Sequence, residues 1–269
     1  MASRGLANTR LNKFLLHMKF GSSRRKLSHL GGGVALFLTA QCLSHAQAEI
    51  TWGMPTYISG DEDIAPVETR IWAYNFGNAS VSPVVNGVTF TGYASNTGNS
   101  DFTLTTVGSS IYQNPNAFGN TGAFYTALSS GYQDLLRSAT YWSGFIDHTQ
   151  TMTLHNLIVG ATYQIQFWVN DSRASYHNTE IVIFTDAVTD GNSVSVRYSD
   201  NGATLGQYVI GTFTAEDANQ VIHLGPYSPQ INAATLGLIA IPEPATTALI
   251  FGAASLCGMA FARRRHRSV

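Results

Sequence analysis

Apolar and polar residues alternate in short stretches through the middle of the chain. The clearest stretch is 162–169, where Tyr163, Ile165, Phe167 and Val169 are separated by threonine, glutamine, glutamine and tryptophan. A period of two puts the four apolar side chains on one face, and the other face is mixed, as in a half-buried antiparallel strand. Similar stretches recur about every ten residues, separated by turn signals. These signals are Asn86-Gly87, Asp190-Gly191 and Asn201-Gly202.

The alternation predicts ten strands and one helix. The strands are Arg70–Phe76, Gly87–Tyr93, Phe102–Val107, Thr149–Leu154, Thr162–Val169, Glu180–Thr185, Ser193–Tyr198, Tyr208–Phe213, Gln220–Leu224 and Thr235–Ala240. The helix is Tyr132–Thr140, with Asp134 near its start. This content predicts an all-β fold, an antiparallel β-sandwich that is jelly-roll-like.

The N-terminus has the layout of an export signal. Residues 1–26 contain seven basic residues and no acid, Leu30–Leu43 is moderately apolar, and Ala46-Gln47-Ala48 precedes Glu49. This order predicts a signal peptide over residues 1–48, cut after Ala48. Ser23-Arg24-Arg25-Lys26-Leu27 leaves a twin-arginine route open beside the general secretory one. Translation could start at Met1 or Met18.

The C-terminus combines three unlike elements within residues 241–269. Pro242-Glu243-Pro244 is followed by an uncharged stretch, Ala245–Ala262, and then by the cluster Arg263, Arg264, Arg265 and Arg267. Eighteen apolar or small residues span about 27 Å as a helix, close to the thickness of a bilayer core. Because basic residues favour the cytoplasmic side, the arginine cluster leaves the rest of the chain outside the cytoplasm.

This order resembles the PEP-CTERM sorting signal of bacterial surface and exopolysaccharide-associated proteins. The resemblance implies that an exosortase-type membrane enzyme recognises Pro242, Glu243 and Pro244 and removes the helix. It also implies passage through an export translocon, a period of anchoring in the inner membrane, and final placement at the cell surface or outside the cell. The two prolines keep the motif extended and accessible.

Between these ends, residues 49–240 form one expected domain without cysteine, because Cys42 and Cys257 lie outside it. All sixteen acids lie between Glu49 and Glu243, and only four arginines and no lysine share that stretch. The net charge near −12 repels phosphate backbones and argues against nucleic-acid binding. Solubility alone also accounts for such a surface.

Catalytic signatures are missing from the sequence, so we expect no enzyme activity. Asp147 and His148 are neighbours that would point to opposite faces of a strand, which argues against a triad with Ser143. His155, His177 and His223 are too scattered to predict a zinc site. A glycan hydrolase would need two facing carboxylates, and the candidates are Asp147, Asp171 and Glu180.

No cofactor is expected, but structural calcium is conceivable because carboxylates and amides cluster in predicted loops. The candidate ligands are Asp61, Glu62, Asp63, Asp186, Asp190, Asn192, Asp200 and Asn201. Solvated turns explain the same residues.

A carbohydrate site would combine aromatic rings with amide and charged partners at the rim of the sandwich. Trp168, Asn170, Asp171 and Arg173 stand together at a predicted strand end. Further rings come from Trp72, Tyr141, Trp142, Tyr176 and Tyr227. The segments 154–171 and 211–215 also resemble strands of galactose-binding-like and carbohydrate-binding sandwich domains, which implies the same fold. Aromatic residues on strands are first of all core material.

The sequence therefore predicts an exported envelope or extracellular-matrix protein, structural or adhesive and associated with exopolysaccharide. A discrete carbohydrate-binding module and a secreted glycan hydrolase are the alternatives.

Overall fold

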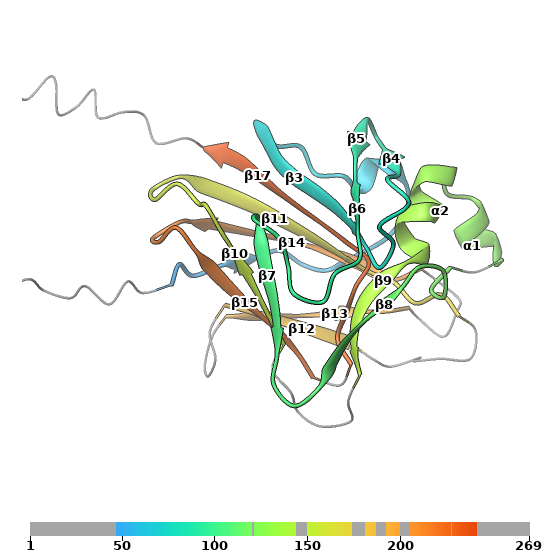
Figure 1. The fold of residues 1–269 in the computed structure, drawn as a ribbon. Coiled ribbons are helices and arrows are strands. Elements are labelled where there is room, and N and C mark those ends of the chain that lie inside the picture. The colour runs from blue at the N-terminus through green and yellow to red at the C-terminus, as the bar shows by residue number, and fades with distance from the viewer. Residues whose placement is uncertain are drawn as a thin grey trace, which may run out of the picture. The chain divides into compact units, whose positions relative to one another are not determined.

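The computed structural model describes residues 47–119, 121–143, 150–173, 181–186, 192–199, 205–226 and 228–240. All of them belong to one compact unit, Ser44–Val269, which is distinct from Met1–Leu43. The described part consists mostly of β-strands in several sheets, with few helices, as in a β-sandwich (Figure 1). Among these residues, no helix is both long and apolar enough to cross a membrane.

The larger sheet has seven strands. In spatial order they are β1 (Thr51–Trp52), β14 (Gln207–Thr214), β11 (Thr162–Val169), β17 (Ala233–Ala240), β3 (Thr69–Phe76) and β6 (Thr91–Tyr93), and β2 (Thr56–Tyr57) also pairs with β14. The second sheet has five: β13 (Ser193–Arg197), β12 (Ile181–Thr185), β15 (Gln220–Gly225), β10 (Gln150–Leu154) and β7 (Phe102–Thr106).

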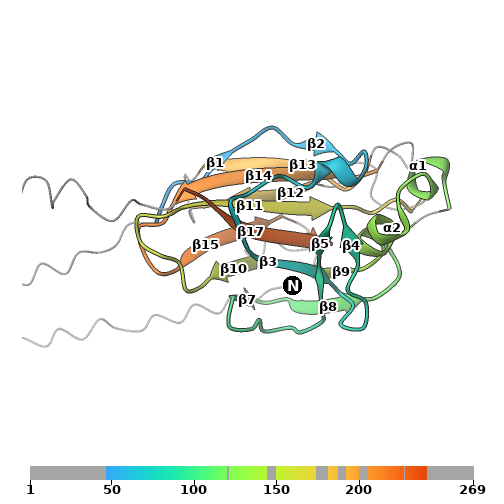
Figure 2. The ribbon, with the colours of Figure 1, turned by 90° about the horizontal axis from the view of Figure 1, so that it is seen from above.

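Smaller elements complete the unit. A three-stranded sheet orders β16 (Gln230–Ile231), β9 (Ala139–Ser143) and β8 (Ser110–Asn114), and β4 (Val84–Val85) pairs with β5 (Val88–Thr89). The helical elements are the 3₁₀ turn η1 (Asp61–Asp63), α1 (Ala123–Thr126) and α2 (Ser130–Arg137). Figure 2 shows α1 and α2 beyond the end of β11.

The main core lies between the two large sheets. Phe167 of β11 stacks on Phe184 of β12 with ring centroids 4.5 Å apart, and both side chains are fully buried. Tyr163, Ile165 and Val169 belong to the same cluster, so the predicted inward face of this strand is confirmed.

The opposite face of β11 is less exposed than the alternation suggested. Thr162 and Gln164 are half-exposed, but Gln166 and Trp168 are completely buried. The reason is a second core, in which Tyr132, Leu135 and Leu136 of α2 cover this face of the sheet. A strand covered on both faces no longer shows a clean alternation of burial.

Helix α2 corrects the predicted bounds Tyr132–Thr140. It begins after Ser129, whose hydroxyl caps it by accepting from the Tyr132 amide at 3.2 Å. It ends at Arg137, and Ala139–Ser143 form β9 instead, where Tyr141 pairs with Tyr112. The run Ala139-Thr140-Tyr141-Trp142 favours a strand because β-branched and aromatic side chains pack well on a sheet.

The expectation of purely antiparallel pairing is wrong at one place. β3 and β6 run parallel, with Tyr74 opposite Thr91 and Phe76 opposite Tyr93. The chain crosses from the end of β3 to the start of β6 through residues 77–90, which include the β4–β5 hairpin. A connection of that length permits a parallel pair, which a tight hairpin cannot form.

Candidate functional site

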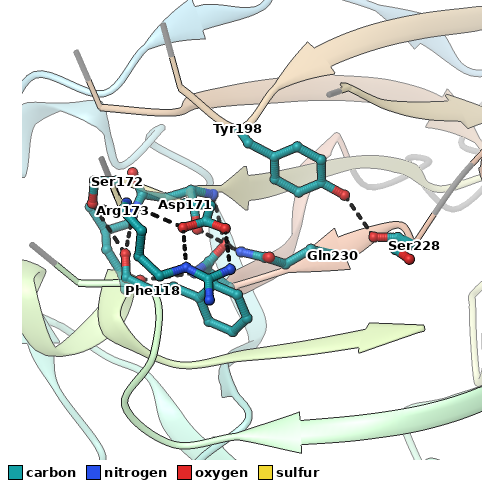
Figure 3. A network of polar contacts seen from close by, with 10 residues as sticks. Phe118, Asp171, Ser172, Arg173, Tyr198, Ser228 and Gln230 are labelled. Carbon is teal, nitrogen blue, oxygen red and sulfur yellow. Dashed lines mark hydrogen bonds and ion pairs between the residues drawn. The ribbon is translucent and has the colours of Figure 1, made fainter. Parts of the chain in front are cut away.

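A pocket of about 160 Å³ opens where β11 ends. Asp171 and Arg173, two of the residues predicted from the sequence, line it. The other lining residues are Asn114, Phe118, Tyr141, Tyr198, Ser228 and Gln230. They come from β9, β16, the last residue of β8 and the segments that follow β8, β13 and β15, so segments far apart in the chain build one site (Figure 3).

An ion pair forms one wall of the pocket. Arg173 donates from Nε to Asp171 Oδ1 at 2.8 Å and from Nη2 to Oδ2 at 2.6 Å (Figure 3). The Arg173 amide also donates to Oδ1, at 3.2 Å. The Asp171 side chain is 1% exposed and that of Arg173 is 32% exposed. This two-point geometry fixes both side chains and cancels their charges.

Aromatic rings form the neighbouring wall. The Arg173 guanidinium lies over the Phe118 ring at 4.9 Å from its centroid. Tyr141 meets Phe118 edge to face at 5.9 Å and stacks on the half-exposed Tyr112 at 5.5 Å. The Tyr198 hydroxyl donates to the Ser228 carbonyl at 2.9 Å. The pocket thus sets flat apolar faces beside fixed polar groups.

Asn170 supports the pocket from behind. Its Oδ1 accepts from the Gly206 amide at 2.9 Å, and its Nδ2 donates to the Phe118 carbonyl and the Ser172 hydroxyl, both at 3.1 Å. A Cβ at Gly206 would lie 1.9 Å from the Val169 carbonyl oxygen, so only glycine fits there. Asn170 is completely buried and ties the end of β11 to the segments around the pocket.

Trp168, the fourth predicted residue, does not line the pocket. Its indole is completely buried in the second core, where Nε1 donates to the Tyr132 hydroxyl at 2.9 Å. Tyr132 in turn donates to Asp63 Oδ2 at 2.8 Å. Trp168 lies in β11 and points to the face that α2 covers, whereas Asp171 follows the strand and lines the pocket. The Trp168 ring therefore serves packing rather than ligand contact.

The other predicted rings also divide between core and pocket. Trp72 and Trp142 are buried in the main core. Tyr141 reaches the pocket, whereas Tyr176 and Tyr227 lie outside the described residues.

Four of the predicted calcium ligands, Asp61, Asp63, Asp186 and Asn192, make hydrogen bonds within the fold. Asp63 accepts from the Ser59 amide at 2.8 Å and from the Ser59 hydroxyl at 2.7 Å, and Asp61 Oδ1 accepts from Ser129 at 2.7 Å. Asp186 accepts from the Ile50 amide at 2.6 Å, and Asn192 donates to the Ile50 carbonyl. Within the described ranges, no three His, Cys, Asp or Glu side chains gather in a way that would hold a metal ion. Asp190, Asp200 and Asn201 lie outside those ranges.

The catalytic candidates are only partly described. Asp147, His148, His177 and Glu180 lie outside the described residues. His155 is bonded to Thr103 at 2.6 Å and to Asn219 at 2.7 Å, and His223 contacts Thr151 at 3.3 Å.

A second hollow, of about 490 Å³, runs along β3 and is lined by Arg70, Trp72, Tyr74 and Asp101, among others. Tyr74 donates to Asp101 at 2.6 Å, and burial together with this carboxylate raises the pKa of Tyr74 to about 12. The Arg70 guanidinium donates to the Ala65 carbonyl and to Thr235, both at 2.8 Å, and burial lowers its pKa. These contacts are internal to the fold.

Comparisons with known proteins assign neither a family nor an activity to the chain. No protein-family profile matches the chain, and no curated protein matches it. Among solved structures, the enzymatically active domain of bacteriophage CBA120 tailspike protein 4 aligns with 52% of this chain at 15% identity and a TM-score of 0.31. The chain spans only 20% of that tailspike chain.

A carbohydrate-binding module of the β-sandwich superfamily aligns with 70% of this chain and 97% of its own, at 13% identity and a TM-score of 0.16. The similarity to such modules is weak. Scores this low support no inference about activity, so the fold rests on the chain's own sheets.

Proposed function

We propose that this protein is an exported envelope or matrix protein whose sandwich binds saccharide in the pocket around Asp171 and Arg173. The observation that carries the proposal is the pairing of aromatic faces with a charge-compensated ion pair, buried at Asp171 and partly exposed at Arg173, at the rim of the sandwich. Sugar rings present apolar faces and hydroxyl edges, and this pocket offers a partner for each.

The charge of the site favours a neutral ligand. Residues 49–243 carry a net charge near −12, since four arginines stand against sixteen acids, fifteen of them within the domain. Such a field disfavours polyanions. Among the described lining residues, the charged groups are Asp171 and Arg173, and these compensate each other. A sugar unit without charge is not repelled by the acidic domain and needs no charged partner in the pocket.

The size of the pocket favours one sugar unit at a time. Its volume of about 160 Å³ is smaller than the roughly 300–1,000 Å³ of pockets that enclose a drug-sized ligand. Single-unit contacts give weak binding, and a polymer with many identical units raises the overall affinity through multivalency. A matrix polysaccharide is such a polymer.

Binding without hydrolysis is the simpler chemistry for this pocket. Glycosidases place two carboxyl groups about 5 to 9.5 Å apart across the bond that breaks. Asp171 is the one carboxylate among the described lining residues, and both of its oxygens accept from Arg173. A carboxylate held in this way serves as a structural acceptor.

The sorting part of the proposal rests on the sequence. Pro242-Glu243-Pro244, the apolar stretch Ala245–Ala262 and the arginines after it lie outside the described residues. We propose that the tail anchors the exported chain in the inner membrane until an exosortase-type enzyme releases it. Intact-mass analysis of protein from membranes and from medium tests this: a released form that ends near Pro244 supports release, and one that still ends at Val269 contradicts it.

Binding is tested on a glycan array that includes neutral oligosaccharides and polysaccharides, with variants that change the aromatic wall. Tyr141→Ala removes the ring that contacts Phe118, and we expect about tenfold weaker binding, or ~1.4 kcal/mol. Tyr57→Ala is the matched control, because Tyr57 is 42% exposed on β2 and does not line the pocket. Equal binding by both variants, with both folded by circular dichroism, would reject the pocket as the site.

A further inference from the structure

Both termini of the described chain lie at one end of the sandwich. β17 finishes at Ala240, which pairs with Thr162 at the start of β11. The β10–β11 turn (155–161) and the β14–β15 turn (215–219) meet there, since the Gly160 amide donates to the Ala215 carbonyl at 2.8 Å. The Ala48 carbonyl accepts a hydrogen bond from Gln220 Nε2 at 3.1 Å. We name this region the exit end.

The pocket lies at the other end of the same strands. Asn170, Asp171 and Arg173 follow the last residue of β11, and Gln230 stands three residues before β17 begins. β17 has eight residues, which corresponds to a length of about 24 Å. In Figures 1 and 2 the β10–β11 turn and the arrowhead of β17 lie on the side away from α1 and α2.

The connection between the sandwich and the apolar tail is short. Four residues, 241–244, separate Ala240 from Ala245. Even fully extended, four residues reach only about 14 Å. The exit end therefore stays close to a bilayer that holds the tail. Pro242 and Pro244 fix two backbone φ angles of the connection and so restrict its conformations further.

We infer that the tail holds the sandwich end-on, with the exit end against the membrane surface and the pocket facing away from it. The inference rests on the proposed membrane tail and is independent of what the pocket binds. The partner of the exit end is the headgroup layer of the bilayer.

The surface of the exit end fits a headgroup layer better than the hydrocarbon beneath it. Ile158 and Val159 are 56% and 60% exposed at the tip of the β10–β11 turn. The carboxylates of Glu216 and Asp217 lie in the adjacent turn. Two aliphatic side chains provide shallow contact, whereas the carboxylates keep the turns in water.

This orientation determines where the pocket lies relative to the membrane. An anchored molecule would hold the pocket about 24 Å beyond the exit end, clear of lipid, so that it can engage polymer outside the membrane before the tail is cut.

Energy transfer to the membrane surface tests this orientation. The mature chain, from Glu49 to Val269, carries Cys257→Ser, and a single donor dye is attached at Val159→Cys or at Val107→Cys. Val107 is the matched control because it is an exposed valine next to Thr106, which pairs with Gln150 at the far end of β10. The protein is reconstituted in phosphatidylcholine vesicles that contain headgroup-labelled acceptor lipid.

We expect the Val159 donor to lie nearer the acceptor plane than the Val107 donor by roughly 20 Å, the length of the intervening strands. Equal transfer from both positions, with the protein floating with the vesicles, would overturn the orientation and leave the tail intact. If the protein does not float with the vesicles, the membrane tail itself is wrong and the orientation falls with it.

Discussion

Replacing Tyr132 by phenylalanine should destabilise the fold through one hydroxyl group. This hydroxyl is fully buried, accepts from Trp168 Nε1 at 2.9 Å and donates to Asp63 Oδ2 at 2.8 Å. Burial and the Asp63 carboxylate raise the pKa of Tyr132 well above its ordinary value, so it stays a donor at neutral pH. Its loss leaves an indole N–H unpaired and removes a hydrogen bond to a buried carboxylate.

An unpaired buried donor costs about 1–3 kcal/mol, and a bond to a charged group contributes a similar amount. Because the two effects share one site and are not additive, we expect a total near 3 kcal/mol. For a domain of this size that lowers Tm by about 6–12 °C.

Urea unfolding followed by tryptophan fluorescence measures the change in the free energy of unfolding. Tyr57→Phe is the control, since Tyr57 is half-exposed and we expect its change to stay within about 0.5 kcal/mol. If Tyr132→Phe matches this control, Trp168 is not held by the contact described, and its assignment to the core rather than to a ligand surface is refuted.

Three further changes have expected outcomes. Burial lowers the pKa of His223 below 6.5, so the unfolded chain takes up the proton before the folded one. The stability from this residue is therefore full above pH 6.5 and is lost as the pH falls through the folded pKa. His223→Gln should make Tm, measured in thermal melts, depend less on pH in this range. Gly206→Ala should cost about 2 kcal/mol or more, because its Cβ would meet the Val169 carbonyl at 1.9 Å, whereas Gly225→Ala has open space and serves as the control in urea unfolding. A mature chain that keeps Ala48 should be more stable, by about 1 kcal/mol, than one that begins at Glu49, because the Ala48 carbonyl accepts from Gln220; denaturation of the two purified forms compares them.

Sequence alternation was a good guide to the long strands. β11 has the predicted bounds, and β3, β7 and β10 each differ from prediction by one residue. Alternation works there because one face of each strand packs in the main core. It failed for β8 and the two-residue strands β1, β2, β4 and β16, which are too short or too polar to show a period. β9 was missed because the predicted helix Tyr132–Thr140 extended into it. The second core also lay beyond reach, because it depends on which face α2 covers.

Three of the eight lining residues, Tyr141, Asp171 and Arg173, were singled out from the sequence. Asp171 and Arg173 stood out because two charged residues followed a strongly apolar strand. Trp168 was wrongly predicted to bind a ligand, because an aromatic residue next to polar ones has the same local sequence pattern whether it faces solvent or a second layer of the fold. Asn114, Phe118, Ser228 and Gln230 join the pocket through long-range strand order, which no local signal contains.

Chemical-shift mapping of the sandwich during titration with the best neutral oligosaccharide from the array tests saccharide binding most directly. Our account predicts shifts confined to residues around the pocket, above all Phe118, Tyr141 and Arg173, with a saturable curve. Shifts concentrated along the hollow of β3, or no shifts with any neutral saccharide, would contradict it.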